Sequence, residues 1–198
     1  MDRSIAGRRA PKVVTVSVKK QDRRYLTERE VERLIDAARR NRYGHRDATM
    51  LLIAYRHGLR AGELVDLQWT QVELNAACLH VRRLKNGTPS VHPMQGDEVR
   101  ALRRLQREQE HRQSYVFVSE RDAPLTPKGF HSLVRRLGED ADLGFRVHPH
   151  MLRHGCGYAL TNAGHDLRRI QLWLGHVNVQ HTVRYTSLSS NVFGEFWR

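Results

Sequence analysis

The chain has 198 residues, of which 39% are apolar and 28% are charged, a composition typical of a soluble globular protein with one sizeable hydrophobic core. Its 34 lysines and arginines outnumber its 21 acidic residues, and the resulting charge of +13 makes nucleic acid the first candidate partner. No apolar run approaches the roughly 18 residues of a membrane span, and the first nine residues lack the apolar stretch of a secretory signal, so we expect a cytoplasmic protein with no membrane partner.

Residues 1–24 mix arginines and lysines with short β-branched stretches and show no sustained period. They predict a flexible basic arm that follows DNA phosphates, although a solvated tail would have the same composition. Regular structure is predicted to begin after Tyr25. Thr27, followed three residues later by Glu30, forms a capping-box pattern, and the apolar residues behind it recur at helical spacing.

The rest of the chain predicts more helices and one hairpin. Residues 78–82 alternate apolar with polar side chains and are followed by Lys85-Asn86-Gly87, a turn sequence, before residues 90–92, which predicts an antiparallel hairpin. A further short strand is predicted at 115–118. Helices are predicted at 46–57, 61–67, 97–109, 127–142 and 180–185, with Gly58, Gly164 and Gly175 as helix stops. The expected fold is mainly α with a small antiparallel β-sheet (α+β).

Four residues are expected in the core rather than in a site. Cys78 and Cys156 are too few for a disulfide framework or a zinc ribbon and are interpreted as small core residues. Leu172 and Trp173 follow the helical apolar spacing before Gly175, which favours core packing over a base-stacking role.

Three separated segments carry the chemistry. They are Gly58-Leu59-Arg60-Ala61-Gly62-Glu63-Leu64, the run His148-Pro149-His150-Met151-Leu152-Arg153-His154, and Leu174-Gly175-His176 with Tyr185 nine residues later. In order and spacing they resemble the sequence blocks of the tyrosine recombinase, or phage integrase, family. Lys85 stands at the position of that family's β-strand lysine. The similarity is greatest to the short invertases that switch bacterial fimbrial promoters.

This resemblance implies a catalytic-domain fold of the tyrosine recombinases over residues 25–190. It implies a site-specific recombinase that cleaves and rejoins double-stranded DNA at specific recombination sites through a covalent 3′-phosphotyrosine, with DNA inversion as the expected outcome. A homo-oligomer on DNA, a tetramer in the synapse, accessory DNA-bending proteins and association with the bacterial nucleoid are implied too. The apolar residues 191–198 are expected either to pack back onto the domain or to dock onto a neighbouring protomer.

The residue types fit that reaction. A phosphodiester under attack gains negative charge, which Arg60 and Arg153 can stabilise as a clamp of planar, permanently charged forks. Tyr185 is the expected nucleophile. A phenol needs a base to lose its proton, and His150 is the candidate. Lys85 is the expected general acid for the leaving oxygen, and His176 is the expected hydrogen-bond donor to the phosphate. Glu63 is expected to orient an arginine, and His154 to be a supporting or packing residue. We expect no metal or other cofactor to take part.

Other interpretations stay open at this point. Charge alone also fits ribosomal-type and membrane-surface proteins, and Lys85 could be an ordinary turn residue. A catalytically silent DNA-binding regulator would keep the same fold without cleavage. A metal-dependent nuclease could use His148, His150, His154 and His176, but the glutamate of a His-Glu-x-x-His site is missing.

Overall fold

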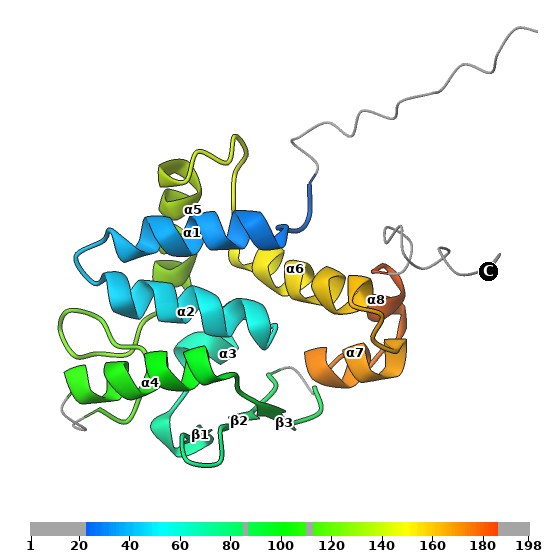
Figure 1. The fold of residues 1–198 in the computed structure, drawn as a ribbon, viewed down its shortest axis with the longest axis horizontal. Helices are drawn as coiled ribbons and strands as arrows, with labels where there is room; N and C mark the ends of the chain where they lie inside the picture. Colours follow the sequence, from blue (N-terminus) through cyan, green and yellow to red (C-terminus); the bar gives the residue numbers. More distant parts are fainter. Residues whose placement is uncertain (1–22, 85–86, 110–112, 186–198) are drawn as a thin grey trace, which may run out of the picture.

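A computed structural model describes residues 23–84, 87–109 and 113–185. Residues 1–22 of the basic arm, Lys85 and the apolar tail at 191–198 lie outside these residues. In chain order the elements are α1 (Glu28–Arg39), α2 (Gly44–Arg56), α3 (Ala61–Val65), the 3₁₀ helix η2 (Trp69–Gln71), β1 (Val72–Glu73), β2 (Cys78–Val81), β3 (Ser90–Pro93), α4 (Gly96–Glu108), α5 (Pro127–Asp140), α6 (Pro149–Asn162), α7 (Leu167–Leu174) and α8 (Gln180–Val183). The expected mainly α fold with one small sheet is confirmed (Figure 1). None of the described helices is long and apolar enough to cross a membrane.

Helix α1 begins where its capping sequence predicts. The Glu30 carboxylate accepts hydrogen bonds of 2.8 Å from both the backbone N–H and the hydroxyl of Thr27. This satisfies a backbone donor that the first helical turn would otherwise leave unpaired. The apolar face of α1, with Val31 and Leu34, is buried, and α1 packs along α2 (Figure 1).

The sheet has three antiparallel strands in the order β1-β2-β3. The predicted hairpin is confirmed, with Leu79 of β2 opposite His92 of β3. Strand β1 was not expected from the sequence. The predicted strand at 115–118 is wrong, because these residues form only isolated bridges, Gln68 with Tyr115 and Val118 with Pro124. Val116 and Phe117 are fully buried there, so a short apolar run that reads as a strand fills the core as an irregular segment.

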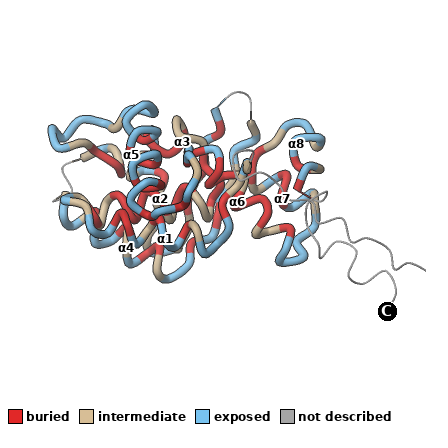
Figure 2. Tube along the Cα trace, turned by 90° about the horizontal axis from the view of Figure 1, so that it is seen from above, coloured by how far each residue is buried: buried red, intermediate tan, exposed pale blue. Residues whose placement is uncertain are grey.

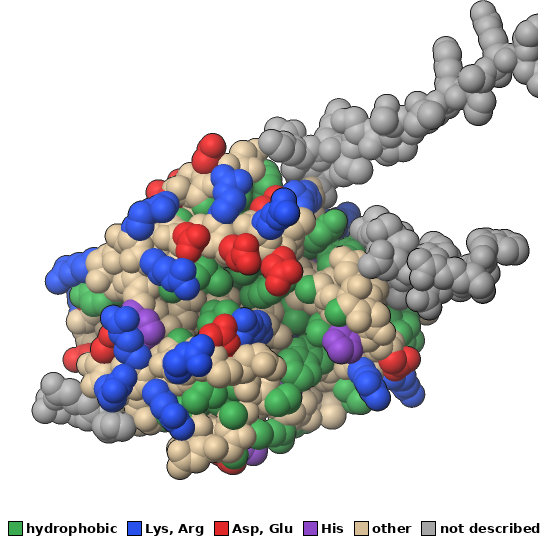
Figure 3. All heavy atoms as spheres, in the orientation of Figure 1, with side chains coloured by type: hydrophobic (Ala, Val, Ile, Leu, Met, Phe, Trp, Pro, Cys, Tyr) green, Lys and Arg blue, Asp and Glu red, His purple; other side chains and the backbone are tan. Residues whose placement is uncertain are grey.

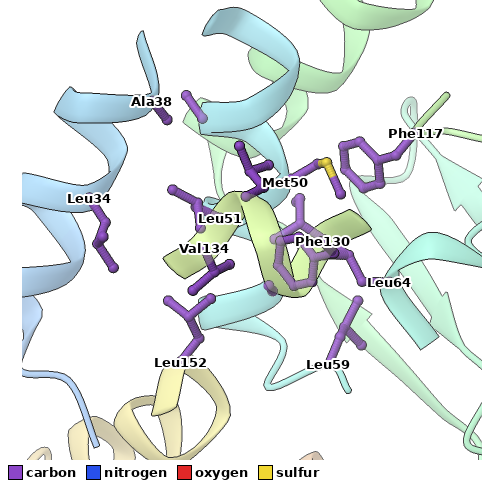
Figure 4. Close-up of a cluster of buried hydrophobic side chains, with 14 of the residues drawn as sticks. Leu34, Ala38, Met50, Leu51, Leu59, Leu64, Phe117, Phe130, Val134 and Leu152 are labelled. Carbon is purple, nitrogen blue, oxygen red and sulfur yellow. The ribbon is translucent and has the colours of Figure 1, made fainter. Parts of the chain in front are cut away.

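Two hydrophobic clusters hold the helices together. The larger lies between α1, α2, α5 and α6 and contains Leu34, Leu51, Phe130, Val134 and Leu152 (Figure 4). Buried residues line the inner faces of these helices along the whole molecule (Figure 2).

The smaller cluster joins the second half of α6 to α7 and to Tyr185, two residues after the end of α8. It consists of Cys156, Tyr158, Ile170, Leu174 and Tyr185. Helix α6 contributes to both clusters, so it ties the core to the region of the predicted nucleophile.

Two of the four expected core residues are not in the core. Cys156 is buried, but Cys78, the first residue of the short strand β2, is only half-buried. Leu172 is 61% exposed, since it lies on the outer face of α7, and Trp173 is half-buried.

Gly58 closes α2 and lets two distant segments approach each other. Its φ of +57° is one that residues with a side chain seldom adopt. A Cβ at this position would lie 2.4 Å from the Leu174 side chain. The turn after α2, which carries Arg60, therefore rests directly against the end of α7, which precedes His176.

Candidate active site

A cavity of about 440 Å³ opens where α6, α7 and α8 meet the start of α3. None of the lining residues that the structure describes carries a carboxylate, while three arginines and four histidines face the cavity. Its lining consists of Arg60, His150, Arg153, His154, Gly175, His176, Val177, Asn178, His181, Arg184 and Tyr185. Six residues singled out from the sequence are thus brought together, although 125 positions separate Arg60 from Tyr185. The site is suited to a phosphate group.

Arg60 occupies the N-cap position of α3 and is oriented by Glu63. The Glu63 carboxylate accepts from the Arg60 backbone N–H at 3.0 Å and from its guanidinium at 2.6 Å. The Glu63 side chain is 1% exposed and that of Arg60 is 26% exposed. The Arg60 guanidinium therefore reaches the cavity, whereas the Glu63 carboxylate is buried beneath it. Burial acts to raise the pKa of Glu63, but the Arg60 N–H and the charge of Arg83 hold it below its usual range. The expected orienting role of Glu63 agrees with this geometry.

Arg153 projects from α6 and is almost completely buried. One terminal nitrogen donates to the carbonyl of Gly58, and the other donates to the carbonyl of Leu174 at 2.6 Å. Each of these nitrogens carries a second N–H that a phosphate oxygen could accept. Burial, together with the charges of Arg60 and Arg83, lowers the pKa of Arg153 to about 10, so the group remains a cation at neutral pH.

Tyr185 lies just after α8, with its ring packed on α6. Its hydroxyl is 3.0 Å from Nδ1 of His154. The ring is fully buried against Gly157, where a Cβ would come within 2.6 to 2.8 Å of three ring carbons. Burial raises the pKa of Tyr185 to about 12, although Arg153 and Arg184 oppose this. The phenol is therefore protonated at neutral pH and needs a base to become a nucleophile.

Three histidines line the cavity with the phenol, and all three are neutral at neutral pH. Burial is the main cause in each case: burial and then Arg153 lower the pKa of His150, burial and then His150 lower that of His154 to about 4, and burial and then Arg153 lower that of His176 to about 3. His150, the base expected from the sequence, stacks on His154 with 5.6 Å between ring centroids. His150 and His154 share one face of α6 because they are four residues apart, and the Tyr185 hydroxyl lies at His154.

His176 is held by its neighbours in the loop after α7. Its Nδ1 is 2.9 Å from the Thr182 hydroxyl, and its carbonyl accepts from the Gln171 amide at 2.9 Å. Since Nδ1 is engaged, Nε2 is the ring nitrogen that a phosphate would meet. Lys85, the expected general acid, lies outside the described residues.

Sequence reasoning missed Arg83, which forms a buried ion pair of 2.9 Å with Glu63. It also missed His181 and Arg184 as cavity residues. An arginine near the end of a short strand is expected to be exposed to solvent, because arginines are rarely buried. The sequence around Arg83 therefore gave no indication that it is buried. Within the described ranges, no group of three or more His, Cys, Asp or Glu side chains is arranged to hold a metal ion.

Comparison with known proteins agrees with this geometry. The family model described as the phage integrase family matches residues 24–191. Type 1 fimbriae regulatory protein FimE of Escherichia coli K12 is 41% identical over 180 residues, which cover 88% of this chain and 91% of that protein.

Solved structures show the same fold. The crystal structure of XerA recombinase superposes with a TM-score of 0.76 at 31% identity, covering 87% of this chain and 63% of that one. The XerH site-specific recombinase, in a post-cleavage complex with a palindromic difH substrate, has a TM-score of 0.73 at 21% identity, covering 87% of this chain and 52% of that one. The chain therefore spans between half and two thirds of these two structures.

Proposed function

The chain belongs to the phage integrase family, and on that premise we propose that it is a tyrosine-type, site-specific DNA recombinase acting through a covalent 3′-phosphotyrosine. One observation carries the proposal. Arg60, Arg153 and Tyr185, which are far apart along the chain, line the same cavity, and none of its described lining residues carries a carboxylate. A scissile phosphate in that cavity would meet two guanidinium groups and a phenol together.

The proposed step is a transesterification. The Tyr185 oxygen attacks phosphorus, the bond from phosphorus to the DNA 5′ oxygen breaks, and the products are a 3′-phosphotyrosyl ester and a free 5′ hydroxyl. Arg60 and Arg153 stabilise the negative charge that grows on the non-bridging oxygens. The loss of one such donor typically slows chemistry by about 10²- to 10³-fold.

Protons move through neighbouring side chains in this scheme. The phenol proton passes to the stacked pair of neutral histidines, of which His154 already holds the hydroxyl and His150 faces the same cavity. His176 hydrogen-bonds the phosphate. Lys85 protonates the leaving 5′ oxygen, a role that rests on its position in the sequence pattern alone.

The ester keeps the free energy of the broken bond, so rejoining needs only the reverse attack by another 5′ hydroxyl. The proposed reaction accordingly uses neither a nucleotide nor a metal. The catalytically silent regulator and the metal-dependent nuclease are the less favoured functions, because the nucleophile and both clamp arginines are present and meet in one site.

The proposed substrate is double-stranded DNA that carries specific recombination sites, and the proposed outcome is inversion, by resemblance to the fimbrial invertases. FimE is named as a regulator of type 1 fimbriae, and XerH was solved on a DNA substrate. We propose further that the protein works as a homo-oligomer on DNA, a tetramer in the synapse, at the bacterial nucleoid, with accessory DNA-bending proteins. Residues 1–24 would follow DNA phosphates, and residues 191–198 would dock onto a neighbouring protomer.

The test is a nicked DNA suicide substrate that loses its 5′ hydroxyl fragment after cleavage. In EDTA the natural protein should form an adduct that survives denaturation, and Tyr185→Phe should form none, because it lacks the attacking oxygen. An adduct that persists in Tyr185→Phe would remove the proposal. DNA binding without an adduct in the natural protein would indicate the silent regulator, and cleavage abolished by chelator would indicate the nuclease.

A further inference from the structure

Arg83 is a buried cation that joins three elements behind the cavity. Its side chain is 0% exposed. It forms the ion pair with Glu63 of α3, donates to the His57 carbonyl at the end of α2 at 3.4 Å, and donates to the Trp173 carbonyl of α7. The guanidinium thus connects the hairpin to both segments that meet at the active site.

Arg83 and Arg153 hold neighbouring carbonyls on the same two segments. Arg83 binds those of His57 and Trp173, and Arg153 binds those of the next residues, Gly58 and Leu174. The two arginines therefore form a double brace between the end of α2 and the end of α7. Displacement of Arg83 would shift both carbonyls that anchor the catalytic Arg153.

Glu63 links this brace to the other clamp residue. Its carboxylate accepts from the guanidinium groups of both Arg60 and Arg83, and also from the Leu84 backbone N–H at 3.3 Å. Arg83 therefore contacts the partner of Arg60 on one side and the anchors of Arg153 on the other. It does so without lining the cavity itself.

The packing around Arg83 leaves no room for it to relocate. A Cβ on Gly175 would lie 2.8 to 2.9 Å from three atoms of the Arg83 side chain, and a Cβ on Gly87 would lie 2.6 Å from its Cβ. Its Nε has no hydrogen-bond partner among the described residues. A buried ion pair with an unsatisfied donor is an inefficient way to stabilise a fold, because apolar side chains of similar volume often do as well. What this pair does supply is a fixed geometry.

We propose that Arg83 is a positioning residue of the recombinase: it sets the distance between Arg60 and Arg153 and so the fit of the clamp to the transition state. The inference rests on the proposed function of that clamp. Arg83→Lys is the variant of choice, since it keeps a cation beside Glu63 but replaces a five-donor fork by a single ammonium group, which cannot span the same three partners.

Arg46→Lys is the matched control. Arg46 is also largely buried, with a side chain 16% exposed; it pairs with Asp47 at 2.8 Å and donates to the Val118 carbonyl at 2.9 Å, and it does not line the cavity. Comparing the two variants separates the loss of a buried fork from the loss of clamp geometry.

The experiment measures adduct formation on two suicide substrates, one with a normal scissile phosphate and one with a methylphosphonate there. The methyl group replaces the charged oxygen whose negative charge the clamp neutralises. A defect in the clamp should therefore slow cleavage of the methylphosphonate less than cleavage of the phosphate. Arg153→Ala is the reference for such a defect. We expect Arg83→Lys to slow cleavage of the phosphate about 100-fold relative to the natural protein, the loss typical of a misplaced catalytic group. On methylphosphonate, its rate should be much closer to that of the natural protein on the same substrate. Arg46→Lys should change neither rate by more than about twofold.

Equal losses of Arg83→Lys on both substrates, or a rate no lower than that of Arg46→Lys, would overturn the positioning role. Failure of the proposed function gives a different result: the natural protein forms no adduct, or Arg153→Ala cleaves phosphate as fast as the natural protein does. Thermal unfolding of each variant shows whether it is folded. If Arg83→Lys does not fold, Arg83→Gln, which keeps two N–H donors at the same buried position but lacks the charge, takes its place with the same two outcomes.

Discussion

The ring of Tyr185 packs so closely on Gly157 that it fits only because glycine has no Cβ. A Cβ at residue 157 would overlap three carbons of the ring. We predict that Gly157→Ala displaces the phenol from His154 and lowers the rate of adduct formation at least about tenfold. A tenfold change in rate corresponds to about 1.4 kcal/mol of activation free energy. The added methyl group can supply that much, since overpacking a buried site typically costs about 1 to 3 kcal/mol. The measurement is the rate of adduct formation on the suicide substrate.

Gly129→Ala serves as the control for that substitution. It lies on α5, where a Cβ would have only ordinary or slightly tight neighbours, and alanine is the better helix former. It should cleave at the natural rate. If Gly157→Ala also does, the phenol does not react from the position seen against α6.

At the residue scale, sequence reasoning found the groups that stand in spaced blocks, and the structure brings Arg60, His150, Arg153, His176 and Tyr185 to one cavity. It could not decide which histidine holds the phenol, because residues four apart share a helix face and only the place of Tyr185 selects one. Nor could it find a buried support that comes from another element, since burial and ion pairing at such a position depend on tertiary packing.

At the element scale, a buried network fixes strand β3 to three helices. His92 of β3 stacks on Trp173 of α7 with ring centroids 3.7 Å apart, and its Nδ1 is 3.1 Å from Nδ1 of His57. His57 in turn is 2.9 Å from Glu98 at the start of α4. The hairpin is thereby attached to the end of α2 and to α7, the two segments whose carbonyls anchor Arg153 of the clamp.

This network should make stability depend on pH. Burial, followed by His57 and Arg83, lowers the pKa of His92 to about 3. Because an unfolded histidine titrates near 6.5, the unfolded chain takes up the proton first as the pH falls. The free energy of unfolding is therefore highest above about pH 6.5 and falls below it. Between pH 7 and pH 5 the loss from this group amounts to about 2 kcal/mol at most.

We predict that His92→Asn, which cannot titrate, loses less stability over that interval than the natural protein. Urea unfolding at pH 7 and pH 5 measures the difference for each. The same pH dependence in both proteins would show that His92 is protonated equally well in the folded and unfolded chains.

Most elements followed from local signals: capping residues, helical apolar spacing and glycine stops predicted the helices, and a turn sequence predicted the hairpin. The errors have one physical source. Strand β1 has two residues and exists only by pairing with β2, while the segment 115–118 is apolar because it fills the core. Neither property is encoded in a local period.

For the whole molecule, the distribution of charge matters more than its sum. On the face shown in Figure 3, acidic side chains lie among the basic ones over α1, α2 and α4. Helices α6 to α8 lie at the other end of the molecule (Figure 1), and the cavity there is lined by arginines and histidines, with no carboxylate among the described lining residues. We therefore expect DNA to meet the cavity end of the molecule.

The predicted consequence is an affinity for DNA that falls steeply with salt, because each phosphate contact releases condensed counterions. Arg184→Gln, at the cavity rim, should weaken binding to specific and unrelated duplexes alike and reduce the slope of log affinity against log salt by about 1. Arg104→Gln on α4 is the control and should leave the slope unchanged. Fluorescence anisotropy over a salt series measures both, and a flat titration for the natural protein would contradict the assignment of this face.

The most direct test of the account is to identify the atom that becomes bonded to DNA. The trapped adduct is digested with trypsin and nuclease, and the modified peptide is sequenced by mass spectrometry. We predict a 3′-phosphonucleotide on Tyr185, in the peptide that begins at that residue after cleavage at Arg184. A nucleotide attached to another residue, such as the neighbouring Tyr158, would contradict the account.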